Sequence, residues 1–452
     1  MKIIIVGDGK VGSILTQQLS REGHDITVID RNSELLGTLQ ETYDVMAVSG
    51  NGASTQVLRT AGVAESDLLI AATSGDEINL LSCFTAKKLG CPHTVARVRN
   101  PEYAGQITFL KDELGLDMTI NPEAAAAHEI YRLLQYPNFI KRDHFAKGRV
   151  EIVELRLEQD SPLAGQKLNE LYKNTKVHVL VCAVERGCEV FIPSGDFEIK
   201  GGDKIYVTAE TPKLAALLRV LGMPIQKIKD VVILGGSRIA YYLAKRLKSV
   251  DAHVKIIERD YERCQELSLL LPKALIIHGD ACQKKLVEEE THGKADALVS
   301  LLNIDEANLV MAMFARQLGV SKVIAKIDRT EYMSVFEKFG VDSMISPKEL
   351  ICSDVIRYVR DMCNASGGGM LTLHRMVDSR IEALEFLAGK GTRYLDKPLH
   401  DLPLKKNLLI LCIIRNGAPI FPNGDDCIHM SDSVIVAAES DQQISELNDI
   451  YL

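Results

Sequence analysis

The sequence contains no tryptophan, and only 5% of its 452 residues are aromatic. It also lacks a basic excess, because 53 lysines and arginines face 61 aspartates and glutamates, for a formal net charge of −8. Proteins that bind nucleic acid neutralise phosphates with a surplus of positive charge. We therefore expect no nucleic-acid partner.

Long apolar runs and metal-binding cysteine pairs are missing too. The longest apolar run, Leu408 to Ile414, is far shorter than the roughly twenty residues that a membrane-spanning helix needs. The ten cysteines form no Cys-x-x-Cys pair, so no metal site is expected. The first residues already read as a strand, which leaves no signal peptide. We expect a cytoplasmic protein with reduced cysteines that reaches a membrane only through a partner.

A glycine-rich turn stands out near the N-terminus. The β-branched run Lys2 to Val6 predicts a buried parallel strand, and apolar residues at helical spacing follow the turn Gly7-Asp8-Gly9-Lys10-Val11-Gly12. A second apolar run ends in Asp30, eighteen residues after Gly12. Strand, Gly-x-Gly-x-x-Gly, helix, strand and acid, in this order, indicate a dinucleotide-binding unit. A unit that keeps the turn and binds nothing is the alternative.

Each part of this motif has a physical role. Gly7 permits the tight turn, Gly9 lets the backbone approach a pyrophosphate, and Gly12 allows the helix to pack close to the strand. The N–H groups of the loop and the positive end of the helix dipole would hold the phosphates. The other loop residues that contribute such groups are Asp8, Lys10 and Val11.

Polar side chains at the ends of the predicted strands complete the candidate site. Asp30 would accept hydrogen bonds from the adenosine ribose and repel a 2′-phosphate, which favours NAD(H) over its phosphorylated form. In this fold, ligands bind at the carboxyl ends of the parallel strands. The further candidates at that edge are Arg31, Asn51, Thr73, Ser74, Arg97 and Arg99.

The two halves of the chain resemble each other. Lys229 to Leu234 repeats the first strand, and Glu258 stands 228 positions after Asp30. Asp76 to Leu80 (DEINL) returns as Asp305 to Leu309 (DEANL). Because the register is kept over about 120 residues, the sequence predicts an internal duplication.

The second glycine-rich turn, GGSRIA, has lost two of its three glycines. Ser237 places a side chain where the backbone should touch pyrophosphate, whereas alanine at position 240 is a tolerated replacement. A nucleotide site remains one interpretation of this turn, and an altered or vacant site is the other. The residues that would form the site are Gly235, Gly236, Ser237, Arg238, Ile239, Glu258 and Asp280.

The pattern of strands predicts the fold class. In the first half, strands near 2–6, 25–29, 44–48, 67–72, 94–98 and 116–120 alternate with helices. The prediction is α/β: two tandem Rossmann-like doubly wound parallel sheets, each followed by a small α+β C-terminal lobe. The predicted domains are 1–135, 145–225, 228–363 and 370–452, and the predicted linkers lie near 136–148, 211–229 and 364–369.

Two helices that begin with proline leave a question open. Residues 122–135 and 347–363 each carry an apolar stripe at helical spacing. Each stripe either packs against a neighbouring lobe or covers the sheet that precedes it in the chain. The sequence alone favours neither arrangement.

Over essentially its full length, the chain resembles the TrkA family, the NAD-binding regulatory subunits of Trk potassium-uptake systems. That family consists of two tandem regulator-of-potassium-conductance (RCK, or KTN) units, each a Rossmann lobe and a small lobe. The motifs that carry the resemblance are Lys2 to Gly7 (KIIIVG), Thr73 to Asn79 (TSGDEIN), Arg97 to Tyr103 (RVRNPEY), and the Gly195-Asp196 and Gly424-Asp425 turns.

The resemblance implies a regulator that is peripheral on the inner face of the cell membrane. It implies a homo-oligomeric ring that gates a multi-spanning potassium-uptake membrane subunit of the TrkH/TrkG type. The expected ligand is NAD(H), with ATP, ADP or AMP as alternatives at the second site.

A cytosolic NAD-dependent oxidoreductase with a duplicated Rossmann fold is the competing interpretation. Such an enzyme needs an acid or base beside the nicotinamide. The histidines do not recur at matching positions in the two halves, and no Ser/His/Asp arrangement is evident. We therefore expect no catalytic residues and a nucleotide that is sensed, not consumed.

Overall fold

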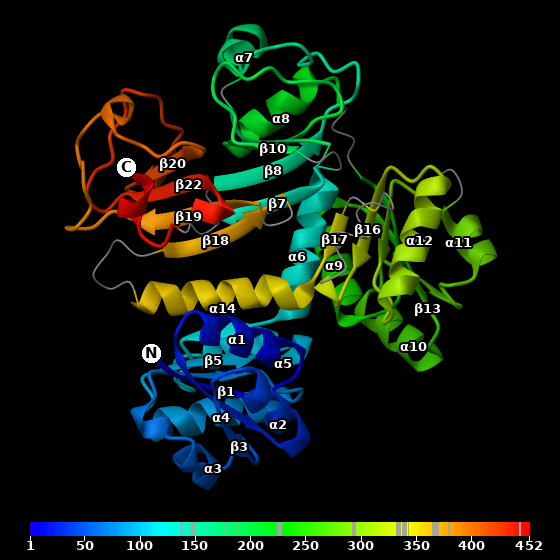
Figure 1. Ribbon diagram of the computed structural model, residues 1–452. Coiled ribbons are helices and arrows are strands. Elements are labelled where there is room, and N and C mark those ends of the chain that lie inside the picture. The colour runs from blue at the N-terminus through cyan, green and yellow to red at the C-terminus, as the bar shows by residue number, and fades with distance from the viewer. Residues whose placement is uncertain are drawn as a thin grey trace.

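The computed structural model describes residues 1–136, 139–145, 150–177, 179–187, 189–223, 228–291, 295–330, 336, 341, 343–363, 370–377, 380–442 and 444–452. Within these residues the strands form two six-stranded parallel sheets and two five-stranded antiparallel sheets (Figure 1). Each parallel sheet precedes an antiparallel one along the chain. This order matches the predicted fold class.

The first Rossmann unit contains the first glycine-rich turn. Its strands lie in the order β3-β2-β1-β4-β5-β6, which is the doubly wound order of dinucleotide-binding folds. The predicted strands are confirmed to within two residues at each end. The strands are β1 (Lys2–Val6), β2 (Asp25–Asp30), β3 (Met46–Ser49), β4 (Leu68–Ala71), β5 (His93–Arg97) and β6 (Met118–Ile120). The helices are α1 (Lys10–Arg21), α2 (Ser33–Thr42), α3 (Thr55–Thr60), α4 (Asp76–Lys88) and α5 (Pro101–Leu110).

The second Rossmann unit repeats this arrangement with the order β14-β13-β12-β15-β16-β17. Its strands are β12 (Asp230–Leu234), β13 (His253–Glu258), β14 (Leu275–His278), β15 (Ala297–Ser300), β16 (Lys322–Lys326) and β17 (Ser343–Ile345). Its helices include α9 (Arg238–Leu247), α10 (Tyr261–Leu270), α11 (Lys284–Thr291) and α12 (Asp305–Gln317). The central strand of each unit is apolar and buried, as expected for a sheet with helices on both faces.

The two small lobes also share one topology, β7-β8-β11-β9-β10 and β18-β19-β22-β20-β21. One face of each sheet packs on the other in a common core that includes Ile152, Cys182, Ala383 and Leu411. The strands are β7 (Lys141–Phe145), β8 (Val150–Arg156), β9 (Leu180–Arg186), β10 (Glu189–Phe191), β11 (Lys204–Ala209), β18 (Met370–Met376), β19 (Ile381–Leu387), β20 (Leu408–Arg415), β21 (Ala418–Ile420) and β22 (Ser433–Glu439). Helices α7 (Leu168–Thr175) and α8 (Thr211–Val220) belong to the first lobe.

Two of the predicted linkers contain regular structure, so the linker predictions were wrong there. Helix α8 occupies the start of the 211–229 stretch, and Leu214, Leu217 and Leu218 are buried in the core of the first small lobe. Strand β7 lies within the 136–148 stretch and pairs with β8. The predicted linker at 364–369 lies outside the described residues.

The helices that follow the two parallel sheets exchange partners. Helix α6 (Pro122–Gln135) follows the first sheet, yet Ile130 and Leu133 share a core with the second unit. Helix α14 (Pro347–Cys363) follows the second sheet, and Val355 and Val359 share a core with the first unit. Figure 1 shows α14 lying along the first unit and α6 beside α9. The question left open by the sequence is therefore answered in favour of the neighbouring unit.

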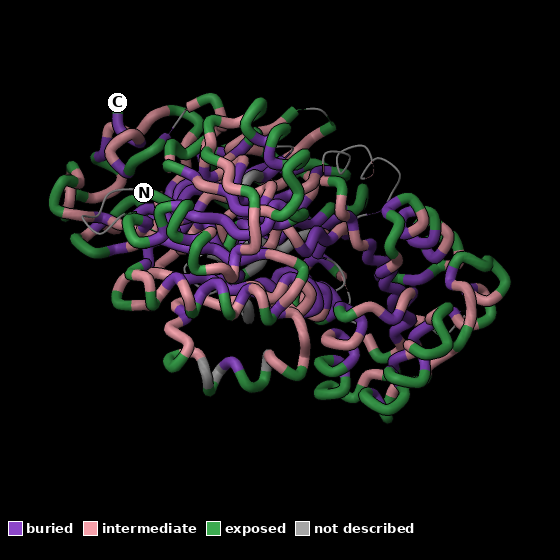
Figure 2. Tube along the Cα trace, turned by 90° about the horizontal axis from the view of Figure 1, so that it is seen from below, coloured by how far each residue is buried: buried purple, intermediate pink, exposed green. Residues whose placement is uncertain are grey.

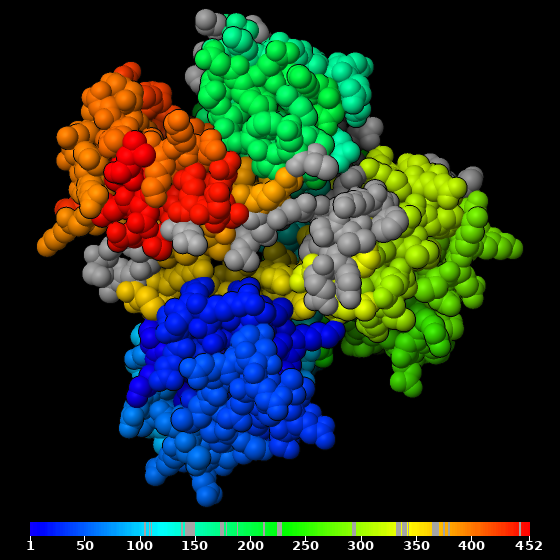
Figure 3. Space-filling model, viewed as in Figure 1, coloured from blue at the N-terminus to red at the C-terminus, as the bar shows by residue number. Residues whose placement is uncertain are grey.

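This exchange holds the two Rossmann units side by side. Figure 3 shows them as two separate lobes of one face, with α14 between the first unit and the second small lobe. In Figure 2 the buried segments run through the middle of the molecule, and exposed turns lie at its rim. An ion pair from Arg360 of α14 to Glu22 adds a polar contact to the apolar packing.

Candidate functional site

A cavity of about 910 Å³ lies at the carboxyl ends of the strands in the first sheet. Residues of the second unit and the first turn of α14 close its other side. The candidates from the first half that line it are Gly7, Asp8, Gly9, Lys10, Val11, Asp30, Arg31, Asn51, Thr73, Ser74, Arg97 and Arg99. The structure thus places twelve of the predicted residues of the first half around one cavity.

The glycines of the first turn have different surroundings. Gly7 has a φ of +96°, and a Cβ there would lie 2.9 Å from the backbone of Thr73. Gly12 lies behind the loop, where a Cβ would come within 1.9 Å of the Gly7 carbonyl oxygen. At Gly9, the N-cap of α1, a Cβ would meet no described atom within 4 Å beyond the adjoining residues, and the glycine lines the cavity. Gly12 therefore serves packing, while Gly9 keeps the loop backbone accessible.

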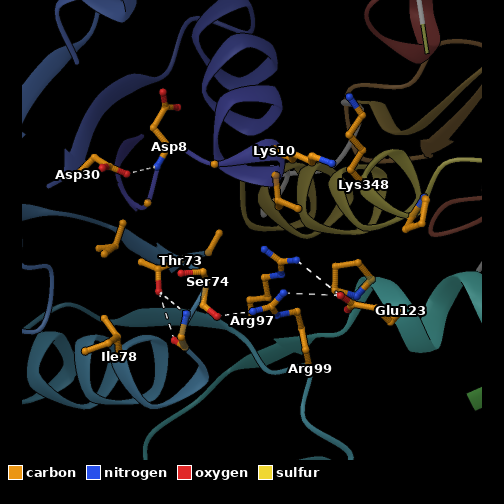
Figure 4. Close-up of a pocket in the computed structure, with 18 of the residues that line it drawn as sticks. Asp8, Lys10, Asp30, Thr73, Ser74, Ile78, Arg97, Arg99, Glu123 and Lys348 are labelled. Atoms are coloured by element: carbon orange, nitrogen blue, oxygen red, sulfur yellow. Dashed lines mark hydrogen bonds and ion pairs between the residues drawn. The ribbon is translucent and has the colours of Figure 1, made fainter. Parts of the chain in front are cut away.

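Asp30 holds the loop in place as well as facing the cavity. One carboxylate oxygen accepts a 2.7 Å hydrogen bond from the backbone N–H of Asp8, and the other accepts one of 2.9 Å from Asn32. Each oxygen has a further lone pair, so the carboxylate can still accept from a ligand hydroxyl. Figure 4 shows Asp30 beside the loop at the cavity edge.

Asp8 is a buried acid beside Asp30. Its side chain is only 8% exposed, and its Oδ1 has no hydrogen-bond partner among the described residues. Burial, followed by the negative charge of Asp30, raises the pKa of Asp8 to about 6. At mildly acidic pH, Asp8 is therefore partly protonated, and the loop carries less negative charge than at neutral pH.

Two arginines line the cavity at the end of β5. The guanidinium groups of Arg97 and Arg99 each lie 3.8 Å from a carboxylate oxygen of Glu123, in the first turn of α6 (Figure 4). Burial, followed by the charge of Arg99, lowers the pKa of Arg97. The Nε atoms of both arginines are buried without a hydrogen-bond partner in the described structure. The Nε of Arg99 faces the Oδ1 of Asp76 at 3.7 Å.

A buried asparagine fixes the strand ends that carry these groups. The side-chain oxygen of Asn79 accepts a 2.9 Å hydrogen bond from the Thr73 N–H, and its amide donates to the carbonyl oxygen of Arg97 at 2.9 Å. In the second unit, Asn308 makes the same bonds to Leu302 and Lys326, at 2.7 and 2.9 Å. The repeated DEINL and DEANL motifs are thus explained as scaffolding.

Side chains of the second unit bond the backbone of the second glycine-rich loop. Arg263 donates to the carbonyl oxygen of Gly236 at 2.7 Å, and Glu258 accepts from the Gly236 N–H at 2.6 Å. The Ser237 hydroxyl accepts from the Ala240 N–H at 3.4 Å and so caps α9. A Cβ at Gly236 would meet Leu267 at 2.6 Å.

The candidates of the second half therefore separate into two groups. Gly235, Gly236, Glu258 and Asp280 lie outside the described lining of the cavity, and Asp280 accepts from the Cys282 N–H. Ser237, Arg238 and Ile239 line the cavity of the first unit. The structure thus directs the start of α9 toward the first loop.

Several lining residues were not among the predicted site residues. They include Leu35, Ile78, Glu123, Asn303, Lys326, Asp328 and Lys348. The duplication carries a signal for three of them, because Lys326, Asp328 and Lys348 occupy the positions that correspond to Arg97, Arg99 and Glu123. Their approach to the first loop follows from the exchange of helices, which the sequence left open.

The cavity has an excess of positive charge, which suits a ligand that carries phosphates. Its lining contributes seven cationic and four acidic side chains. These are Lys10, Arg31, Arg97, Arg99, Arg238, Lys326 and Lys348, against Asp8, Asp30, Glu123 and Asp328. In the part of the chain that the structure describes, no cluster of three His, Cys, Asp or Glu side chains is arranged to hold a metal ion.

Two protein-family models each match both halves of the chain. The TrkA-N domain model matches residues 3–122 and 231–347, and the TrkA-C domain model matches residues 152–222 and 383–450. The chain belongs to the TrkA family. Because each model matches twice, the internal duplication is confirmed.

Curated relatives extend this match over the whole chain. A Trk system potassium uptake protein TrkA homolog from Archaeoglobus fulgidus is 33% identical over 451 residues, covering 100% of both chains. The Trk system potassium uptake protein TrkA of Haemophilus influenzae is 31% identical, covering 100% of this chain and 98% of its own. TrkA-family membership therefore applies to the full length.

Solved structures share the fold at lower identity. The RCK domain of GsuK has a TM-score of 0.61 at 18% identity, covering 98% of this chain and 93% of that one. A structure of the GsuK channel bound to NAD has a TM-score of 0.62 at 17% identity, covering 98% and 77%. The fold of this TrkA-family chain is thus that of tandem RCK units. Among its described helices, none combines the length and apolar character needed to cross a bilayer.

Proposed function

We propose that the chain is a nucleotide-sensing regulatory subunit that binds NAD(H) and gates a potassium-uptake protein in the membrane. The observation that carries this proposal is the cavity, which joins an open glycine-rich loop to an excess of positive charge supplied by both Rossmann units. The adenosine ribose would bond Asp30, and the pyrophosphate would lie at Gly9 and the start of α1. The other half of the dinucleotide would extend toward Thr73, Arg97 and Arg99.

The regulatory part of the proposal rests on family membership. Relatives of full length are Trk system potassium uptake proteins. A nucleotide held between the two Rossmann units can bias their relative position only through its different affinity for two arrangements. The ring and the membrane partner of the TrkH/TrkG type, and with them a peripheral location on the inner face of the cell membrane, remain parts of this proposal.

The four-part division of the chain at 1–135, 145–225, 228–363 and 370–452 is retained here as a proposal. For the second loop we propose a vacant site, because Arg263 bonds the carbonyl oxygen of Gly236 and the Ser237 side chain caps α9. ATP, ADP or AMP at that loop is the competing proposal.

Binding and uptake measurements test the proposal. Calorimetry with NADH should show binding, and incubation of NADH with carbonyl substrates should show no change in absorbance. Deleting the protein should lower potassium uptake while the membrane subunit remains in the membrane. Turnover of NADH would favour the oxidoreductase, and normal uptake in the deletion strain would contradict the potassium role.

A further inference from the structure

Asp328 reaches the cavity of the first unit from the second unit. It follows β16 and its side chain is 24% exposed. One carboxylate oxygen lies 2.7 Å from the Nζ of Lys10, the first residue of α1, and 3.8 Å from the Nζ of Lys326. The ion pair with Lys10 therefore crosses the cavity between the two units.

This carboxylate is held in its charged form by lysines. Burial opposes its ionisation, but the hydrogen bond from Lys10 and the charges of Lys326, Lys10 and Lys348 outweigh that effect and keep the pKa of Asp328 below its ordinary value. At the corresponding position of the first unit stands Arg99. An acid thus occupies a place among cations where a phosphate would otherwise be favoured.

The partner of Asp328 in this ion pair, Lys10, belongs to the first glycine-rich loop. A lysine at the start of α1 would ordinarily be available to a phosphate at the helix N-terminus. Here the described contact of its ammonium group is with Asp328. Asp328 therefore adds a negative charge to the cavity and pairs with the ammonium group of this lysine, whose side chain is 72% exposed.

We infer that Asp328 is a specificity-determining residue that selects a dinucleotide over a nucleoside triphosphate in this cavity. The inference rests on the proposed function, because it assumes adenosine near Asp30 and two phosphates at the loop. A third phosphate in line with these would approach the Asp328 carboxylate and be repelled. A dinucleotide places an uncharged ribose in that region, and its hydroxyls can donate to the carboxylate.

Titration of the full chain with NADH and with ATP tests the inference. Asp328→Asn keeps the shape of the side chain and removes its charge. ATP affinity should rise at least tenfold, while NADH affinity should stay within about threefold of the wild type. The gain for ATP should shrink as salt is added, because it is electrostatic.

Glu306→Gln is the matched control. Glu306 also belongs to the second unit, is paired with Arg329, and lies outside the described lining of the cavity. This variant removes the same charge and should leave both affinities unchanged. An equal rise in ATP affinity in Glu306→Gln would overturn the inference, since net charge and not position would explain it.

Two further variants keep the result interpretable. Asp328→Ala should reproduce the gain for ATP if the asparagine variant folds poorly, as judged by thermal unfolding. Lys10→Gln combined with Asp328→Asn should give a smaller gain, because the released lysine is absent. If the wild type binds NADH and both Asp328 variants leave ATP affinity unchanged, the proposed function stands and this inference fails. If the wild type binds no NADH, the proposed function fails. The ratio of the ATP affinities of variant and wild type then still shows whether Asp328 repels a triphosphate.

Discussion

The two Rossmann units keep the same scaffold and differ in what their glycine-rich loops face. Asn79 and Asn308 bond the ends of the central strands in the same way, and Asp76 and Asp305 each accept backbone N–H groups after the fifth strand. Asp30 and Glu258 each accept a backbone N–H of their loop, but the first loop lines a cavity, whereas the second loop is bonded by Arg263. Duplication has therefore preserved the residues that hold the sheet and changed those that face a ligand.

The changes turn the second unit into a wall of the first site. Ser237 caps α9, and the residues at the ends of its strands point toward the first loop. Where the first unit has Arg99 and Glu123, the second has Asp328 and Lys348, so the charge is reversed at both positions. Residues of both units thus line one cavity.

A substitution in one of the exchanged helices should give the largest effect, a loss in the free energy of unfolding. Ile130 of α6 is fully buried in the core of the second unit, so Ile130→Ala should cost about 2–5 kcal/mol in the free energy of unfolding. Hydrogen exchange should place the lost protection in the second unit. Leu269→Ala is the control, since Leu269 is 84% exposed in α10. Loss of protection confined to the first unit would contradict the exchange.

The shared scaffold predicts equal stability effects and unequal binding effects. Asn79→Ala and Asn308→Ala should each destabilise the protein by about 1–3 kcal/mol, because buried backbone groups lose their partners. Only Asn79→Ala should also weaken NADH binding, since it releases Thr73 and Arg97. Chemical denaturation and calorimetry measure the two quantities. Equal loss of NADH affinity in both variants would argue against a single site.

The two acids at the ends of β2 and β13 offer a direct comparison of the loops. Asp30→Ala should weaken NADH binding at least tenfold, about 1.4 kcal/mol, because it removes charged hydrogen bonds and frees the loop. Glu258→Ala should change NADH affinity by less than threefold, because Glu258 lies outside the described lining of the cavity. An unchanged affinity in Asp30→Ala would rule out the assigned position of the ribose.

The pH dependence should give the smallest effect. The ordinary pKa of an aspartate, 3.8, is raised to about 6 at Asp8, so the folded state binds this proton more tightly than the unfolded state. The resulting stability is present below about pH 4 and is lost as the pH rises through about 6. Relative to Asp8→Asn, the wild type should lose on the order of 1 kcal/mol between these values. Parallel stability curves for the two proteins would contradict the raised pKa.

Local patterns made much of the fold predictable. Alternating β-branched runs and helical stripes located the strands of the first parallel sheet, and the duplication predicted that a second sheet repeats them. The stripe on residues 122–135 predicted a helix but not the sheet that it covers, because both units offer equivalent apolar surfaces. Arg263 and Asp328 were missed for a related reason: their partners, Gly236 and Lys10, are distant in sequence and are brought near by tertiary packing.

We propose that one cavity, shared by the two units, replaces two equivalent nucleotide sites. Calorimetric titration of the full chain with NADH measures the number of sites directly. We expect one NADH per chain, and we expect Asp30→Ala to remove this binding while Glu258→Ala leaves it. Two NADH molecules per chain, bound with equal affinity, would contradict it.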